Sequence, residues 1–353
     1  MFLVVIKPSR SWLCTMSLHE SFLLMHSNYP SWGCVVVPDK RYSVRQHRGS
    51  GDAAMLNIPE LTKQYTIVSY SPTASSMALS APELVITFYD IALAPPVIEN
   101  AASPNPWKSR YALNFKKIPY KTNWILLPDI STVRTSFNVP ASRTFADGSP
   151  YHTLPMLSDP ATGKVIGDSF EIAVYLQRQH PSSGGDLFPE QDLSFTYGEG
   201  PVLFAPIAES KVEKSIEAYV KFNTSVDAAF TAHVPLMVHG LPFDPATAEQ
   251  SKAEFSRRAG IPWEDLSVKG EQRGEMLKSY EQALSGLAEL YRRDITGPFL
   301  LGNRPSYADF IVGGWLRMSQ VTLPKEEWEA LTSWHDGIFG QLHQALEAYA
   351  QMD

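Results

Sequence analysis

The pattern of apolar and polar positions predicts a strand, a helix and a second strand between residues 84 and 126. Residues 84–89, LVITFY, form a continuous apolar run rich in β-formers, which is typical of a strand buried on both faces. From Pro104 onward, apolar residues return at helical spacing as far as Phe115, and residues 120–126, YKTNWIL, then alternate with the period of a strand. This part of the chain therefore opens as a βαβ unit.

The pattern of short elements continues to about residue 180. Residues 154–157 and 164–166 are expected strands joined by the turn sequence SDPATG, and Ile172, Tyr175 and Leu176 mark an amphipathic helix. An irregular helical stretch precedes them. The order of strand, helix, strand, irregular helix, strand, strand and helix is that of a thioredoxin-like α/β fold.

Helical periodicity dominates the C-terminal half of the chain. After the sequence HPSSGGDLFPEQD, apolar residues recur at helical spacing in three groups, which are Val212, Ile216, Tyr219, Val220 and Val226, then Leu277, Tyr280, Leu284, Leu287 and Tyr291, then residues 310–318. We therefore expect a thioredoxin-like domain over residues 83–182, a linker over 183–200 and an all-helical domain over 201–353.

Residues 1–82 show no sustained period of either kind and include the small, polar sequence SYSPTASSMALSAPE. This composition predicts an N-terminal extension with little fixed structure, with a small folded domain as the alternative. Met77 lies directly before the first expected strand and would serve as a translation start, in which case residues 1–76 would not be translated.

The bulk composition narrows the class of protein. With 353 residues, 44% of them hydrophobic, the chain is long enough for two packed cores. A net charge of -7 without a cluster of Lys and Arg argues against nucleic acid as a partner, and no apolar run reaches the roughly 18 to 20 residues that span a membrane. Because Cys14 and Cys34 are the only cysteines and form no CxxC motif, we expect no disulfide framework, no metal site and a reducing, cytoplasmic location.

The sequence TLPML places a proline inside an expected strand. Proline cannot donate to a β-ladder and is confined to strand edges or special sites. A cis Leu154–Pro155 bond would turn the backbone N–H and C=O of Leu154 outward, where they can pair with a peptide-like ligand. An edge strand with a trans proline is the alternative, and the motif alone does not decide between them.

Two further motifs mark helix starts. In GDSFEIA, Asp168 has the spacing of a capping box, but the free N–H groups and the Ser169 hydroxyl also suit a carboxylate, while Asp168 suits an ammonium group. Together these two residues could hold the α-amino acid end of a γ-glutamyl group. Ser306 and Asp309 form a capping pair before a helix that is apolar on nearly every face, so we assign them a structural role.

Three of these motifs resemble the signature set of the cytosolic glutathione transferases, namely TLPML, the DS at the next helix start, and PFLLGNRPSYADF in the helical part. Within that superfamily, SPNPWKSRYALNFKKIPYKT and RAGIPWEDL are similar to the fungal etherase-related, serine-type transferases and to the bacterial β-aryl etherases. The resemblance covers residues 85–336. It implies a thioredoxin-like domain followed by an all-α domain, with glutathione as co-substrate and no metal.

We expect glutathione contacts at six positions, which are Arg143, His152, Leu154, Pro155, Asp168 and Ser169, and the resemblance implies those of Leu154, Asp168 and Ser169. Leu154 would offer its backbone to the cysteinyl part, and Asp168 and Ser169 would hold the γ-glutamyl end. Many members have Glu where this chain has Asp168, which shortens the reach and keeps the charge. Arg143 and His152 are candidates for the glycyl carboxylate, with solvated loop positions as the alternative.

Ser103 matches the position of the activating residue in this family. It is also an N-cap candidate, with Pro104 at the first helical position. A hydroxyl at the positive end of a helix can donate to a thiolate and lower the pKa of the thiol, and Asn105 could share that role. No cysteine follows residue 84, which leaves a serine-type enzyme.

The resemblance implies an enzyme that conjugates glutathione to hydrophobic aromatic or aryl-ether electrophiles, or cleaves them with it, in detoxification or secondary metabolism. A weakly catalytic carrier of hydrophobic or phenolic ligands is the alternative, and the sequence leaves open whether the protein forms a homodimer. Trp107 and Met237 are candidates for the substrate pocket, with the core as the alternative for Trp107. Lys108 and Arg110 are expected on a solvated face.

Overall fold

The computed structural model describes residues 85–141, 143–145, 147–198 and 214–352, together with four strands between residues 3 and 38. The chain divides into two compact units, Met1–Met77 and Ala78–Asp353. The first unit contains an antiparallel sheet in the order β1-β2-β3-β4, with bounds Leu3–Ile6, Leu13–Leu18, Ser21–Asn28 and Ser31–Pro38.

These four strands differ from the expectation of little fixed structure over residues 1–82. In the register of the sheet, Leu23 pairs with Met16 on one side and with Val36 on the other. The strands contain runs such as FLLM and CVVV rather than an alternation of apolar and polar residues, so a search for period-2 alternation misses them. The rest of the predicted extension lies outside the described residues.

The second unit contains a mixed sheet in the order β10-β9-β5-β6. The central strand β5 (Ile86–Ala92) runs parallel to β6 (Tyr120–Leu126) and antiparallel to β9 (Met156–Asp159), which pairs with β10 (Lys164–Ile166). A two-stranded ribbon of β7 (Arg143–Thr144) and β8 (Pro150–Tyr151) lies outside this sheet. The expected strands at 120–126 and 164–166 coincide with β6 and β10, and the other two begin two residues later than expected.

Strand β5 is buried on both faces, as its apolar run predicts. Phe88 is completely buried in the core that contains Tyr111 of helix α2 (Pro104–Phe115), whereas Tyr89, the next residue, packs in a second cluster with Ile130 of α3 (Ile130–Ser136). Successive side chains of a strand point to opposite faces. The sheet therefore lies between α2 and α3, and α2 also packs against α4 (Ser169–Gln179).

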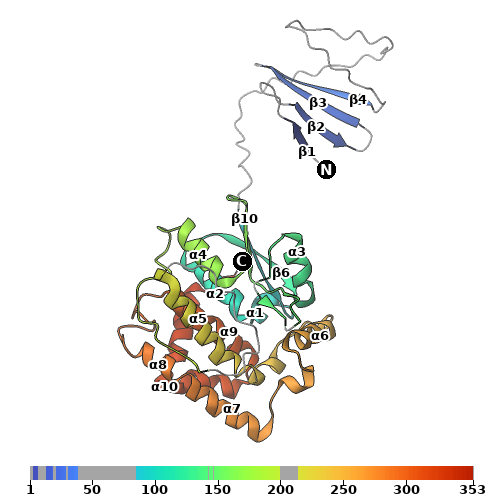
Figure 1. Cartoon of the computed structure of the whole chain (residues 1–353). Helices are drawn as coiled ribbons and strands as arrows, with labels where there is room; N and C mark the ends of the chain where they lie inside the picture. The colour runs from blue at the N-terminus through green and yellow to red at the C-terminus, as the bar shows by residue number, and fades with distance from the viewer. Residues whose placement is uncertain are drawn as a thin grey trace, which may run out of the picture. The chain divides into compact units, whose positions relative to one another are not determined.

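The remaining helices form one cluster beside this α/β layer (Figure 1). Their bounds are α5 Lys214–Thr231, α6 Ala248–Ala259, α7 Gly270–Ala283, α8 Ser285–Tyr291, α9 Tyr307–Thr322 and α10 Lys325–Leu346. The short helix α1 (Val97–Asn100) precedes α2, and five 3-10 turns complete the helical elements of the described residues, at Leu127–Asp129, Val234–Leu236, Val238–Gly240, Trp263–Leu266 and Glu347–Tyr349.

Helix α9 lies at the centre of the cluster and is buried along nearly its whole length, as predicted. Gly314 permits its close approach to α2, because a Cβ atom at this position would lie 2.5 Å from the carbonyl oxygen of Pro104, the first residue of α2. The packing of α9 therefore fixes where the start of α2 lies.

The predicted capping pair at the start of α9 is confirmed. The Asp309 carboxylate accepts hydrogen bonds from the backbone N–H of Ser306 (2.8 Å) and from the Ser306 hydroxyl (3.0 Å), and it also accepts one from the backbone N–H of Leu300 (2.9 Å). Burial raises the pKa of Asp309 to about 6, although these hydrogen bonds oppose the shift. The carboxylate thus joins the helix start to the loop before it.

Asp309→Ala should lower the free energy of unfolding by about 1 to 3 kcal/mol at pH 7, because it leaves buried N–H groups of Ser306 and Leu300 without their acceptor. Urea unfolding monitored by circular dichroism measures the change. Asp309→Asn is the matched control. It should lose less free energy of unfolding, since its amide oxygen can still accept a hydrogen bond from one of these N–H groups. Equal midpoints for wild type and Asp309→Ala would contradict the structural role.

Candidate active site

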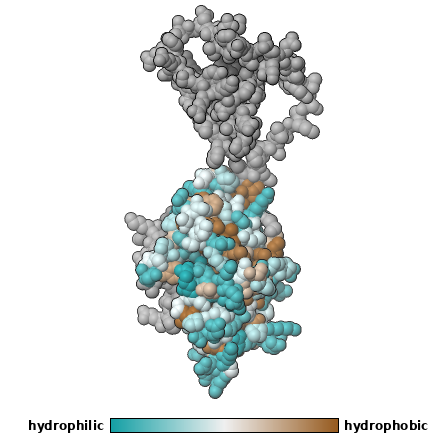
Figure 2. Space-filling view, turned by 90° about the vertical axis from the view of Figure 1, so that its right-hand side faces the viewer, coloured by the Kyte–Doolittle hydropathy of each residue, from teal (hydrophilic) through white to brown (hydrophobic). Residues whose placement is uncertain are grey.

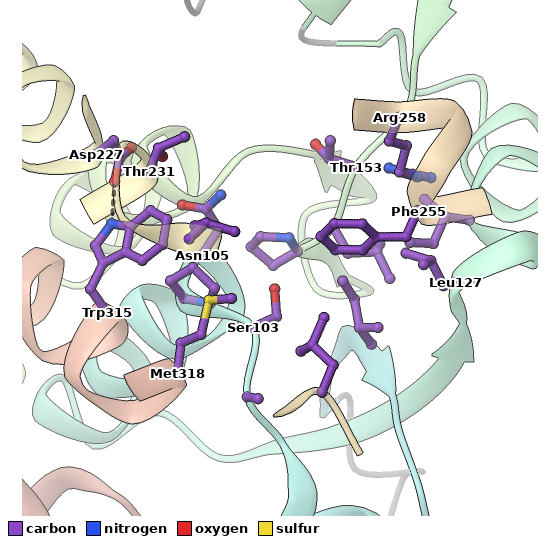
Figure 3. A pocket seen from close by; sticks show the side chains of 18 of the residues that line it. Ser103, Asn105, Leu127, Thr153, Asp227, Thr231, Phe255, Arg258, Trp315 and Met318 are labelled. Atoms are coloured by element: carbon purple, nitrogen blue, oxygen red, sulfur yellow. Dashed lines mark hydrogen bonds between the residues drawn. The ribbon is translucent and has the colours of Figure 1, made fainter. Parts of the chain in front are cut away.

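A cavity of about 290 Å³ lies at the start of α2, where the α/β layer meets the helical cluster. In the close-up, Ser103 and Asn105 lie between two groups of side chains that face each other across the cavity (Figure 3). Asp227 and Trp315, from α5 and α9, are on one side, and Phe255 of α6 is on the other. The cavity therefore combines the N-terminus of α2 with walls from three helices of the helical cluster.

Ser103 lies at the N-cap position of α2, but its side chain makes no capping hydrogen bond. Pro106, the third helical residue, has no N–H to offer a cap, and the N–H of the second residue, Asn105, makes no hydrogen bond with the Ser103 side chain. The simple capping interpretation of Ser103 is therefore wrong. The half-buried Ser103 and Asn105 both line the cavity.

The Leu154–Pro155 peptide bond is cis, as one of the two predicted alternatives required, and both residues line the cavity. The segment is held from behind by Arg134 of α3, which sequence analysis missed. Its guanidinium donates to the carbonyl oxygens of Thr153 (2.8 Å) and Gly167 (2.6 Å), and burial lowers its pKa to about 10. One buried side chain thus positions both the proline turn and the start of α4.

Asp168 is the N-cap of α4 and lines the cavity. Its carboxylate accepts a hydrogen bond from the backbone N–H of Phe170 at 2.8 Å, so the predicted cap is present. Burial raises the pKa of Asp168, while that N–H group and the positive charges of Arg143 and Lys108 oppose the shift. A carboxylate in this setting favours a cationic partner in the cavity.

The other predicted glutathione contacts divide into two groups. Arg143 of β7 lines the cavity, whereas His152 and Ser169 are not among the lining residues. The ring of His152 contacts the Ser131 hydroxyl through Nδ1 (2.8 Å), and Ser169 is buried at the first position of α4. The structure therefore brings Arg143, Leu154, Pro155 and Asp168 together with Ser103 and Asn105.

The two predicted pocket residues lie in the core instead. Trp107 is 3% exposed, and its indole N–H donates to the carbonyl oxygen of Ala101 at 2.7 Å. Met237 is completely buried, with its sulfur 3.8 Å from the Ser319 hydroxyl. Trp107 therefore takes the core position that the sequence offered as its alternative. Met237 is not among the residues that line the cavity, whereas Val234, Leu241 and Phe243 of the same segment are.

Sequence analysis also missed a buried ion pair at the cavity wall. Lys108 of α2 is completely buried, and its ammonium group lies 2.5 Å from Asp227 Oδ1 and 3.0 Å from Asn223 Oδ1. Burial lowers the pKa of Lys108, and the charge of Asp227 opposes this. Arg110 is buried too and pairs with Asp90 of β5 at 2.7 Å. The expectation that Lys108 and Arg110 lie on a solvated face of α2 is therefore wrong.

Within the described residues, no group of three or more His, Cys, Asp or Glu side chains is placed to hold a metal ion. None of the helices in this part of the chain has the length and apolar character needed to cross a membrane.

Comparison with known proteins identifies the family. Residues 102–179 match the glutathione S-transferase N-terminal domain and residues 220–349 match the glutathione S-transferase C-terminal domain. The two family domains occur in this order and their matches together span more than half of the chain. The chain therefore belongs to the glutathione S-transferase family. The predicted fold class, a thioredoxin-like domain followed by an all-α domain, is confirmed.

Individual proteins similar to this chain share a quarter to a third of their residues with it. The glutathione S-transferase-like protein ustS of Aspergillus flavus is 26% identical over 273 residues, which cover 74% of this chain and 90% of that protein. A glutathione S-transferase of Ceriporiopsis subvermispora, solved in complex with glutathione, is 29% identical with a TM-score of 0.62, covering 76% of this chain and 99% of that one. Glutathione transferase GSTFuA3 from Phanerochaete chrysosporium is 25% identical with the same TM-score, covering 76% and 98%.

Lys108→Met should lower the free energy of unfolding by about 3 kcal/mol, because it leaves the Asp227 carboxylate without its buried counter-ion. The double variant K108M/D227L should recover part of that loss, since it removes both members of the buried ion pair but leaves the Trp315 indole N–H without its acceptor. Urea unfolding at pH 7 measures both. A double variant as unstable as the single one would show that the two charges are not coupled.

Proposed function

We propose that the protein is a glutathione transferase whose bound thiolate attacks an electrophilic aromatic or aryl-ether carbon of a hydrophobic molecule in the cavity. A sulfur–carbon bond forms, the leaving group departs with its bonding electrons, and the thiol proton goes to solvent before the attack. The position of Ser103 carries the proposal, because its side chain lines the cavity at the positive end of α2 and makes no capping bond.

The placement of glutathione follows from the charges that line the cavity. Asp168 suits the γ-glutamyl ammonium group, and Arg143 suits the glycyl carboxylate better than His152 does, since only Arg143 of the two lines the cavity. Leu154 offers its backbone to the peptide between them. The glutathione bound in the relative from Ceriporiopsis subvermispora supports this choice of co-substrate.

The second substrate is expected to be apolar. The cavity wall on the helical side includes the side chains of Val234, Leu241, Phe243, Phe255 and Met318, which bind flat hydrophobic molecules without a polar partner. The same wall also suits the alternative function, carriage of hydrophobic ligands with little turnover. A cytoplasmic location stays a prediction of the cysteine content, and a role in detoxification or secondary metabolism stays a prediction of the family resemblance.

Ser103→Ala should raise the pKa of the bound glutathione thiol, because it removes a hydrogen bond that favours the thiolate. Turnover with an aromatic electrophile should fall near neutral pH and recover in part at alkaline pH, where the thiol ionises unaided. Ultraviolet difference titration of the complex measures this pKa. Stability should change little, since no capping bond is lost.

Asn105→Ala is the matched comparison for that experiment. A large pKa shift in Asn105→Ala with a small one in Ser103→Ala would transfer the activating role to the asparagine. No shift in either variant would contradict activation at this helix start and favour the carrier function.

Asp168→Asn should raise the Kd of glutathione at pH 7 by about 10-fold or more, because it removes the charge that faces the ammonium group and keeps the shape. Burial raises the pKa of Asp168, so its carboxylate should protonate at a higher pH than an ordinary Asp does. As the pH falls, binding of glutathione to the wild-type protein should therefore begin to weaken at that higher pH. Isothermal titration calorimetry measures both effects. Wild-type affinity in the variant would refute this placement of glutathione.

A further inference from the structure

The helical side of the cavity contains a carboxylate that the proposed chemistry does not use. Asp227 of α5 lines the cavity among mainly apolar side chains, and its own side chain is 17% exposed. Figure 3 shows it beside Trp315, whose indole N–H donates to Asp227 Oδ1 at 2.6 Å. A carboxylate in such a wall is costly unless it is satisfied by donors.

The protein supplies donors mainly to one of the two oxygens. Among the described residues, Oδ1 receives Lys108 at 2.5 Å and Trp315 at 2.6 Å, whereas Oδ2 receives the Asn223 amide alone, at 3.2 Å. A carboxylate oxygen has room for about two hydrogen bonds. The Asp227 carboxylate therefore keeps acceptor capacity at Oδ2.

The charge of the carboxylate is already balanced by the protein. Lys108 is completely buried beneath it and forms the ion pair. A cationic ligand would compete with this lysine, and an anionic ligand would be repelled by Asp227. The group that suits the remaining acceptor best is a neutral donor, such as a hydroxyl group on an aromatic ring.

We propose that Asp227 determines specificity by accepting a hydrogen bond from a neutral hydroxyl group of the second substrate, so that hydroxylated aromatic molecules are preferred over otherwise matched ones. The proposal rests on the function proposed above, in that the cavity holds the second substrate. A ligand that fills the cavity but has no donor removes water from Asp227 Oδ2 without replacing its hydrogen bond. This cost is why a site built around a hydrogen bond binds ligands without the donor more weakly.

The test uses three naphthalenes that differ in one substituent, 2-naphthol, 2-methylnaphthalene and 2-naphthoate. Their affinities for the wild-type protein are measured at pH 7 by fluorescence titration in the presence of glutathione. 2-Naphthol should bind about 10-fold tighter than 2-methylnaphthalene, and 2-naphthoate should bind weakest because it is an anion. This comparison needs no variant, so equal affinities of the naphthol and the methylnaphthalene would overturn the proposal directly.

The variants then locate the acceptor. K108M/D227L removes the carboxylate together with its counter-ion, and the preference for 2-naphthol should fall to about 2-fold or less. Thr231→Val is the matched control, because it removes the hydroxyl of another residue on the same wall, and it should keep the preference. A preference that survives K108M/D227L, or that is lost in Thr231→Val alone, would overturn the assignment to Asp227.

Calorimetry with glutathione alone separates this proposal from the function on which it rests. A protein that binds no glutathione would contradict the proposed transferase, whatever its order of preference among naphthalenes. A protein that binds glutathione but does not prefer 2-naphthol would contradict only the role of Asp227.

Discussion

The position of α2 is the constraint on which the site depends. Gly314 of α9 lets that helix approach the carbonyl oxygen of Pro104, and Lys108 pairs with Asp227 of α5 at 2.5 Å. On the opposite side, Arg110 pairs with Asp90 of the central strand. Helix α2 is thereby held between the sheet and the helical cluster, and its N-terminus is presented to a cavity that neither domain could form alone.

The buried charges of α2 explain why this arrangement is specific. A buried ion is tolerated only where a partner of opposite charge is in place, so a displaced helix would leave Lys108 or Arg110 desolvated and unpaired. Arg134 is buried on the other side of the cavity without an ion pair in the described part of the chain, and its guanidinium instead donates to the carbonyl groups of Thr153 and Gly167. The cavity is thus positioned by charged groups in the layer behind its walls.

Local sequence determined several of the helices and strands and part of the site. The bounds of α2 and β6 follow from short-range periodicity, and the cap at Asp309 follows from the spacing of two residues within one turn. The proline at position 155 and the acid at position 168 were likewise recognisable, because strand edges and helix starts impose requirements on single residues.

Only the tertiary structure decided which side chains meet at the cavity. Lys108 looks like a solvated residue in the sequence because its partner, Asp227, lies 119 positions away. Trp107 and Met237 are as apolar as true pocket residues, and nothing local distinguishes a side chain that faces the core from one that faces a cavity. Periodicity reports which face of a helix is apolar, whereas the identity of the neighbour on that face is set by packing between distant segments.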